Sequence, residues 1–514
     1  MTIHHPLPHL LLATVALVLA ACTGADDDRA HEVWSLDQGT DRIHVYDADH
    51  EQVAVIDVSP DALREVDPTF DPEAGRTVPH MIDFDTEDRY AFVAATAGGV
   101  TIVLDAVERS VEAVLPTGAG THMAAVTPDD DAVWVAAIGA EQLVEIPLDL
   151  GAATPSFEIG RSIDVEPLLA DTGYDWPSFS PVCHDYDEQG RAWVTLGPGI
   201  EQGGLFVFDT GSAEVVHAYD PAEIRANCGV GFTADGSQAI ANWSGTFGED
   251  REDTEGQWYV FDTDDLSVVH TASSDGIDAH GVRLTPDGSA FWQVNRGSDD
   301  GQIIDADSLE VVDTLDAGDT PDILDFAPDG SVAYVTQRGP NPLSGDPHVA
   351  VGSAPGLLVL DVATGEHLDL LAPPEVTDAD GGVLNDVHGV GVRTTTGQER
   401  VVAAAAPRAP RAPTGAATVP GSGTTPRGSF RVRGSGATWE GARCSGTSSP
   451  RNTRCSGTWS PGSSPTRWCP TTSSGSARAA CHGSCGPRPG RSGCCAPTCP
   501  RRTAAVACPT SATT

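Results

Sequence analysis

The sequence predicts an all-β protein: a seven-bladed β-propeller of four-stranded blades, closed by pairing of the two chain ends. Three observations predict this fold. The chain repeats with a period of about 42 residues, two kinds of hairpin alternate along it, and it begins with one kind and ends with the other. An open pair of packed sheets is the structural alternative, because topology is harder to predict than the presence of strands.

The first kind of hairpin is built around a tight turn rich in Asp, Pro and Gly. Short alternating stretches such as MIDF and ILDF precede this turn, and β-rich stretches such as YAFVAA and VAYVTQ follow it. Asp and Gly suit the backbone angles of hairpin turns. The turns lie at 85–88, 127–130, 187–190, 233–236, 285–288 and 327–330, and a looser seventh copy joins 387–392 to 400–403.

The second kind of hairpin alternates with the first. Its copies lie at 41–58, 98–115, 141–150, 203–219, 256–272, 301–315 and 356–371. With strands A and B in the first kind and C and D in the second, the chain reads CD, then AB–CD six times, then AB. Pairing of the terminal halves closes the ring and leaves few exposed sheet edges. Residues 32–37 are expected to add one redundant strand at this seam.

The repeat resembles the YVTN-type and quinoprotein-like propeller repeats of bacterial surface and exported proteins, in which A strands end in Pro-Asp-Gly. This chain carries that tripeptide at 286–288 and 328–330. The resemblance covers residues 31–406. It implies the propeller fold and does not specify an activity.

The N-terminus has the layout of an export signal. Residues 10–21 form an apolar run that is too short to span a bilayer as a mature helix. Leu19-Ala20-Ala21-Cys22 resembles the lipobox of bacterial lipoproteins, in which the Cys is lipidated and becomes the first mature residue. The resemblance implies a signal peptide over 1–21 and a membrane anchor at Cys22 on the extracytoplasmic face, with an acidic tether over 22–30. An ordinary secretory signal is the alternative.

The net charge of −45 is the sum of two unlike parts. Residues 1–400 hold 15 Arg and 73 acidic residues, or −58, whereas residues 401–514 hold 14 Arg and one acidic residue, or +13. So negative a body excludes nucleic acid as a partner. Nine of the 12 Cys also lie in the second part. Residues 407–514 are therefore interpreted as a disordered segment or an out-of-frame translation of a GC-rich gene, and we assign them no function.

Metal-ligating residue types recur where the predicted A strands begin. The long connections (59–79, 161–182, 244–256, 339–355 and 372–386) all rise from one face of the ring, and the A strands start on that face beside the central channel. Loop-rich faces on rigid scaffolds carry binding sites. The matching positions hold His80, His122, Val182 (followed by Cys183 and His184), Cys228, His280, Asp322 and His388.

Three interpretations of these residues stay open. Imidazoles at His80, His122, His184, His280 and His388 could hold Cu or Zn, because imidazole suits both metals. This resembles in principle the propeller of nitrous oxide reductase, although the paired His motif of that family is absent. Alternatively, the polar residues only line a wet channel. In the third interpretation one or two His act as general acid or base, and Ala279-His280-Gly281-Val282 resembles the streptogramin-lyase-like propellers.

Cys183 and Cys228 fall near the same edge of neighbouring blades. In an exported protein we expect them to form a disulfide, with free thiols or soft-metal ligands as the alternatives. Taken together, the sequence predicts a surface-anchored propeller that binds a ligand or a protein partner on its loop-rich face. Two alternative functions stay open. One is a metalloprotein that holds Cu or Zn in the ring of His residues, with or without redox activity, and the other is a propeller lyase or lactonase.

Overall fold

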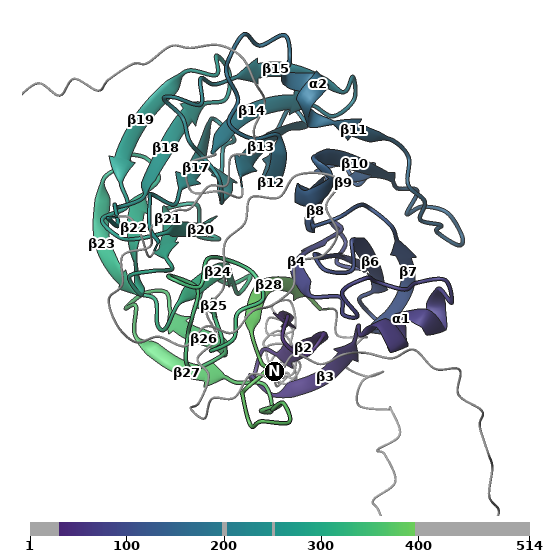
Figure 1. Cartoon of the computed structure of the whole chain (residues 1–514). Coiled ribbons are helices and arrows are strands. Elements are labelled where there is room, and N and C mark those ends of the chain that lie inside the picture. The colour runs from purple at the N-terminus through teal and green to yellow at the C-terminus, as the bar shows by residue number, and fades with distance from the viewer. Residues whose placement is uncertain (1–29, 198–202, 249–251, 396–514) are drawn as a thin grey trace, which may run out of the picture. The chain divides into compact units, whose positions relative to one another are not determined.

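The computed structural model describes residues 30–197, 203–248 and 252–395. Within these residues, β-strands form seven four-stranded antiparallel sheets arranged as the blades of a ring (Figure 1). This confirms the predicted seven-bladed β-propeller. The chain divides into two compact units, Met1–Arg411 and Ala412–Thr514, and the second unit lies outside the described residues. No helix of the described part is long and apolar enough to cross a membrane.

We number the blades from the one that joins the chain ends and give the innermost strand first. Blade 1 consists of β28 (Val387–Thr394), β1 (His31–Asp37), β2 (Arg42–Asp47) and β3 (Gln52–Asp57), and blade 2 of β4 (Pro79–Phe84), β5 (Tyr90–Ala95), β6 (Val100–Asp105) and β7 (Ser110–Leu115). Blade 3 consists of β8 (Thr121–Val126), β9 (Ala132–Ala137), β10 (Gln142–Pro147) and β11 (Ser162–Asp164). Blade 4 consists of β12 (Ser180–Tyr186), β13 (Arg191–Gly197), β14 (Gly204–Asp209) and β15 (Glu214–Ala218).

The other three blades are blade 5, with β16 (Val230–Phe232), β17 (Gln238–Trp243), β18 (Gln257–Asp262) and β19 (Val268–Ser273); blade 6, with β20 (Ala279–Leu284), β21 (Ala290–Asn295), β22 (Asp300–Asp305) and β23 (Val311–Asp316); and blade 7, with β24 (Pro321–Phe326), β25 (Val332–Gln337), β26 (Gly356–Asp361) and β27 (His367–Leu371). The helical elements are α1 (Pro60–Val66), η1 (Ile138–Ala140) and α2 (Val165–Leu169).

The ring closes in blade 1, where β28 pairs with β1. The predicted pairing of the chain ends is therefore confirmed, but the predicted redundancy of residues 32–37 is wrong. β1 is the second strand of the blade: it pairs with β28 on one side and β2 on the other, and all of its residues are buried. The second strand had been expected at 400–403, which lies outside the described residues. A buried strand that is hydrogen-bonded to a neighbouring strand on each side is an integral part of the blade, not a redundant strand.

Blade 3 also departs from the predicted pattern. The hairpin expected over 141–150 supplies only β10, and the outermost strand β11 follows after the intervening residues 148–161. Gln142, Leu143 and Val144 pair with β11, and the ladder ends before Pro147. Proline has no backbone N–H to donate, so it suits the end of a strand.

Aromatic side chains of the second strands fill the spaces between blades. Trp134, Trp193 and Trp292 are each at most 1% exposed, as is Trp34 in β1. Trp292 of blade 6, for example, packs in one buried cluster with Leu324 and Phe326 of blade 7. The core therefore lies between neighbouring sheets, and the innermost strands are left to face the centre of the ring (Figure 1).

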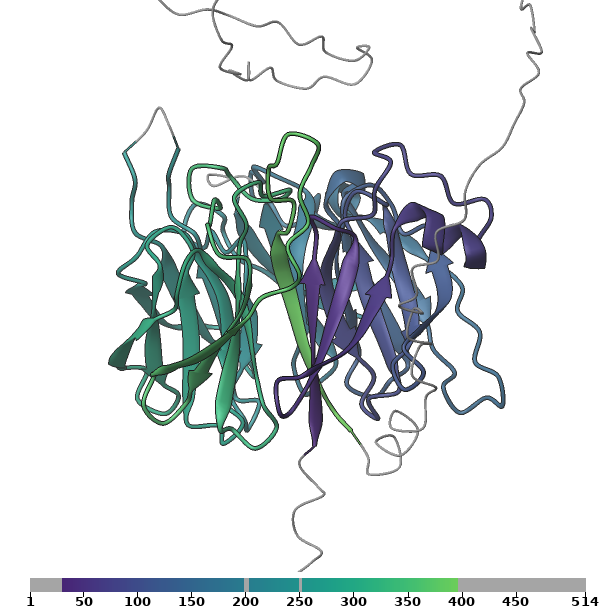
Figure 2. The ribbon, with the colours of Figure 1, turned by 90° about the horizontal axis from the view of Figure 1, so that it is seen from below.

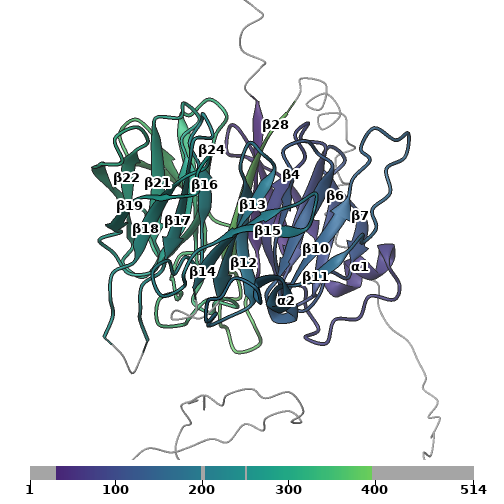
Figure 3. The ribbon, with the colours of Figure 1, turned by 90° about the horizontal axis from the view of Figure 1, so that it is seen from above.

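The innermost strands set the geometry of the site. Each one packs against the innermost strand of the next blade around the whole ring, and the strands run between two loop-bearing faces (Figures 2 and 3). The A–B and C–D turns share one face, and the D–A and B–C connections share the other. α1, which Ser59 caps, lies in one of these D–A connections.

Candidate functional site

A β-bulge interrupts the innermost strands at the repeat position where the sequence places the His, Cys and Asp residues. In six blades the pairing with the second strand shifts register at this position. A bulge turns a side chain out of the regular alternation, and bulges recur next to functional sites. The residues released from pairing include His80 in β4, His122 in β8, Val182 and Cys183 in β12, His280 in β20, Asp322 in β24 and His388 in β28. Blade 5 instead begins its strand late and places Cys228 just before β16.

Three imidazoles from consecutive blades form one group, which we call the imidazole cluster: His388 of blade 1, His80 of blade 2 and His122 of blade 3. The ring of His80 stacks on that of His388 with centroids 3.8 Å apart, and it lies 4.1 Å from the ring of His122. His80 and His388 are buried, and His122 is half-buried.

Backbone carbonyls fix the tautomers of two members of the imidazole cluster. His122 Nδ1 lies 3.0 Å from the carbonyl oxygen of Val182, and His388 Nδ1 lies 3.0 Å from that of His80. A carbonyl oxygen only accepts, so Nδ1 carries the proton in both rings and Nε2 keeps its lone pair. His80 has the opposite tautomer, because its Nδ1 accepts a hydrogen bond from the side-chain amide nitrogen of Gln38. Its Nε2 therefore carries the proton and is buried without a hydrogen-bond partner.

The imidazole cluster is uncharged near neutral pH. Burial, together with the neighbouring imidazoles, lowers the pKa of His80 well below its ordinary value. Burial lowers the pKa of His122 to about 4 and that of His388 well below its usual range. Neutral imidazoles are the form that binds metal ions.

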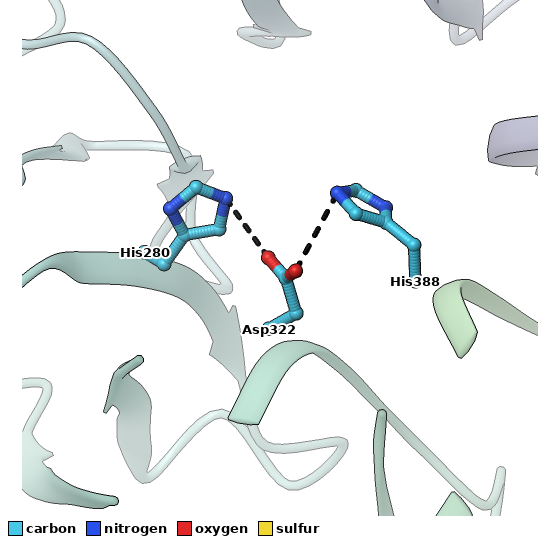
Figure 4. A group of neighbouring side chains, drawn as sticks. All are labelled: His280, Asp322 and His388. Atoms are coloured by element: carbon cyan, nitrogen blue, oxygen red, sulfur yellow. Dashed lines mark ion pairs between the residues drawn. The ribbon is translucent and has the colours of Figure 1, made fainter. Parts of the chain in front are cut away.

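A charged group adjoins the imidazole cluster and centres on Asp322. His280 Nε2 lies 3.0 Å from Asp322 Oδ1 and His388 Nε2 lies 3.6 Å from Oδ2, so the carboxylate sits between the two imidazoles (Figure 4). Arg296 Nη1 lies 3.2 Å from both carboxylate oxygens, and Arg338 Nη1 lies 2.5 Å from Oδ2. Although burial opposes it, Arg296 first, and then His388, His280 and Arg338, hold the pKa of Asp322 well below its usual range.

The charges of this group balance. Arg296 also pairs with Asp278 at 2.7 Å, and Arg338 pairs with Asp386 at 2.8 Å. Burial and Arg296 oppose protonation of His280, but Cys228, and after it Asp322 and Asp278, keep its pKa well above the ordinary value. The carboxylates of Asp278, Asp322 and Asp386 thus balance the guanidinium groups of Arg296 and Arg338 and the imidazolium of His280. This pairing makes the burial of six charged groups tolerable.

A second set of ionisable residues lies three positions further along the innermost strands. Asp83, Asp185, Arg283 and Asp325 all occupy this position, and Arg283 Nε lies 3.4 Å from Asp325 Oδ1. Burial raises the pKa of Asp83 to about 7 and also raises that of Asp185. Burial thus favours the uncharged forms of Asp83 and Asp185, and Arg283 is paired with Asp325.

No protein-family model matches the sequence, and no curated protein matches it. Three solved structures are similar in fold. Hydrazine synthase of Kuenenia stuttgartiensis is 15% identical, with a TM-score of 0.45 over 58% of this chain and 86% of that chain. The Dos1 propeller is 14% identical, with a TM-score of 0.45 over 70% and 89%. Dihydro-heme d1 dehydrogenase NirN, in complex with DHE, is 15% identical, with a TM-score of 0.42 over 71% and 75%. No residue role is carried over from these proteins.

Of the predicted ligands, the structure does not bring His184 to the others. His184 pairs in the regular ladder with Val194 rather than lying in the bulge. Its Nε2 donates to the carbonyl oxygen of Trp134 at 3.0 Å, between blades 3 and 4. The bulge of blade 4 holds Val182 and Cys183 instead.

Cys183 and Cys228 are buried next to each other and are free thiols in this structure. A hydrogen bond with Cys183, together with burial, raises the pKa of Cys228 well above its ordinary value. The expected disulfide therefore stays a prediction, with its two residues already side by side.

Sequence reasoning missed Gln38, Arg296 and Arg338. Each directly follows the second strand of its blade, in blades 1, 6 and 7. The signal was present in the sequence: a long polar side chain at the same repeat position, on the face where the A strands begin. All three contact members of the imidazole cluster or Asp322.

The donor set can be tested for fit to a metal ion. Within the described ranges, His280, Asp322 and His388 are the one group of three whose candidate ligand atoms all lie within 4.8 Å of one another. Two guanidinium groups already occupy Asp322, so its carboxylate is a poor metal ligand. The Nε2 atoms of His122 and His388, which keep their lone pairs, are the better donors.

Proposed function

We propose that the protein binds a transition-metal ion, Zn or Cu, at the channel mouth through the Nε2 atoms of His122 and His388, beside His80. One observation carries the proposal: the Nδ1 atoms of His122 and His388 donate to backbone carbonyls, which leaves the Nε2 lone pair of each ring available to an ion. A metal-binding His typically holds its second ring nitrogen in such a hydrogen bond, which orients the ring and fixes its tautomer.

Chemistry favours imidazole-binding metals over hard cations. Neutral imidazole suits Zn and Cu, whereas Mg and Ca prefer carboxylate and carbonyl oxygen. The charged group around Asp322 is internally balanced, so it does not add a net positive charge beside the ion.

We further propose that the protein works outside the cytoplasm, anchored by lipid at Cys22. The lipobox-like sequence supports this location. Labelling with a fatty-acid analogue tests it: label should enter the wild-type chain and should be absent from a Cys22→Ser variant. Equal labelling of both chains would refute the anchor.

Metal titration of the full chain tests the proposed function. Accessible thiols are first alkylated, so that the cysteines of residues 407–514 do not bind the ion. Isothermal calorimetry with Zn(II) and with Cu(II) then compares wild type with a His122→Ala, His388→Ala double variant. We expect the double variant to lose one binding site, or to weaken it by more than the roughly 10–100-fold typical of an outer-shell change.

His184→Gln is the matched control. It removes a buried His of the same innermost-strand region whose ring faces Trp134 rather than the imidazole cluster. It should bind the ion like wild type. The metal proposal fails if the double variant keeps wild-type affinity and stoichiometry while circular dichroism shows it folded.

A second candidate, a lyase or lactonase, is favoured by one further observation. His280 and His388 flank one carboxylate with pKa values displaced in opposite directions, which is the pattern of an acid and a base. Ring opening of a panel of lactones tests this candidate. Turnover by wild type that disappears in His280→Gln would support it, and no turnover with any lactone would remove it.

A further inference from the structure

Cys183 and Cys228 join the innermost strands of two neighbouring blades. Cys183 lies in the bulge of β12 in blade 4, and Cys228 lies just before β16 in blade 5. Their exposures are 5% and 3%, and the two side chains pack together and hydrogen-bond to each other. Neither residue belongs to the proposed metal-ligand set.

The thiol pair is connected to the imidazole cluster through Val182. Val182 and Cys183 are consecutive residues of one bulge, and the carbonyl of Val182 accepts the proton of His122 Nδ1 at 3.0 Å. Thr195 holds the other side of the bulge, because its hydroxyl lies 3.1 Å from both the N and the O of Cys183. The position of Cys183 therefore sets where the carbonyl that orients His122 can lie.

We propose that Cys183 and Cys228 form a disulfide that fixes this bulge and thereby orients His122 for metal binding. The positioning role rests on the proposed function, whereas the bond itself does not. Cys183 acts as a positioning residue, since its link to the metal runs through Val182 and His122.

The chemistry is a thiol–disulfide exchange. One Sγ–Sγ bond forms and two S–H bonds break, and the two electrons and two protons pass to a disulfide-donating partner, which is reduced to its dithiol. Both thiols are buried in the folded ring, so the exchange takes place while the chain folds, before blades 4 and 5 close over them. The proposed extracytoplasmic location provides an oxidising compartment.

Peptide mapping tests the bond. The full chain is isolated from an oxidising compartment, denatured without reductant, alkylated and cleaved after Arg. Residues 162–191 and 226–251 should appear as one linked species, two hydrogens lighter than the two peptides together, and reduction should separate them. Recovery of both peptides carrying the alkyl group would overturn the proposal.

A set of three variants tests the positioning role. Cys183→Ser, Cys228→Ser and the double variant each remove the same bond, so a disulfide predicts equal losses of Zn(II) or Cu(II) affinity in all three, by about 10-fold. Additive losses from the two single changes would mean two independently packed thiols and would overturn the proposal. Unchanged affinity in all three would overturn the positioning role.

The two proposals fail separately. If wild type yields linked peptides but binds no metal, the proposed function and the positioning role fall together while the bond stands. If wild type binds metal with both thiols alkylated in the peptide map, only the disulfide proposal falls.

Discussion

The Nδ1 atom of His388 in blade 1 lies 3.0 Å from the backbone carbonyl oxygen of His80 in blade 2. The same arrangement recurs between blades 3 and 4, where His122 Nδ1 reaches the carbonyl of Val182. In both cases the acceptor belongs to the bulge of the next blade. The contact between neighbouring innermost strands therefore determines which ring nitrogen is left available to a ligand.

Gly389 allows this close contact, and replacing it should disrupt the site. A Cβ at Gly389 would overlap the carbonyl oxygen of His80. We expect Gly389→Ala to lower the free energy of unfolding by about 1–3 kcal/mol, as overpacking does, and to weaken metal binding. Urea denaturation followed by circular dichroism measures the first effect.

Gly231→Ala is the matched control for Gly389→Ala. Gly231 also lies in an innermost strand, but the nearest atom to its added Cβ would be 3.6 Å away, on the side chain of Ile240. This variant should keep wild-type stability within about 1 kcal/mol, the usual cost of a change without a clash. Equal stability of both Ala variants would contradict the close-contact explanation.

Buried histidines should make the metal-free protein less stable in mild acid. Burial lowers the pKa of His122 and His184 to about 4, from the ordinary value of about 6.5 for an exposed imidazole. Between these values the folded chain stays neutral at both sites while the unfolded chain binds protons. The free energy of unfolding therefore falls as the pH drops through this window, by up to about 1.4 kcal/mol per pH unit for each group.

His184→Gln provides the test of this pH dependence. Removing one of the two groups should make the decline in unfolding free energy between pH 7 and pH 5 shallower than in wild type. Urea denaturation at several pH values in the presence of a chelator measures it. Equal slopes for wild type and His184→Gln between pH 7 and pH 5 would contradict the assignment.

The fold was predictable because its determinants repeat. Turn residues such as Asp287 and Gly288 recur at one repeat position, and Gly288 adopts a positive φ of 74° that glycine accommodates. Each copy therefore reinforced the interpretation of the others. The seam was the part that failed: residues 32–37 pair with the next strand, β2, and also with β28, and only the long-range pairing with β28 makes them the second strand of blade 1.

The sequence predicted where the site lies, but only some of the residues that form it. His80, His122 and His388 stand at one repeat position and meet at the channel mouth. His184 was expected with them, but the bulge in β12 spans two residues and ends before it, so its side chain faces Trp134. The length of a bulge depends on the pairing between two strands, and sequence spacing does not reveal it.

Asp322 should be essential for the structure of the charged group. Asp322→Asn leaves Arg296 and Arg338 buried beside a neutral amide, and removing one partner of a buried ion pair costs about 3–5 kcal/mol. Thermal and urea denaturation measure the loss. Asp61→Asn is the control, since Asp61 pairs with Arg64 on the surface and such pairs contribute about 0–1 kcal/mol. Similar stability of the two variants would contradict the buried network.

The propeller should close without the residues that follow β28. Among the residues that the structure describes, the last contacts at the seam are made by β28 and Thr395: Arg393 Nε lies 3.0 Å from Glu32 Oε2, and the N–H of Thr395 donates to the carbonyl of Ala30 at 2.8 Å. A chain ending at residue 395 should therefore melt within a few degrees of the full chain. Shortening it further, to end at residue 386, removes β28 and leaves β1 as an unpaired edge, so its melting temperature should fall sharply or the cooperative transition should disappear. Calorimetry of the three chains separates these outcomes, and a large loss of stability on ending the chain at 395 would show that later residues complete the ring.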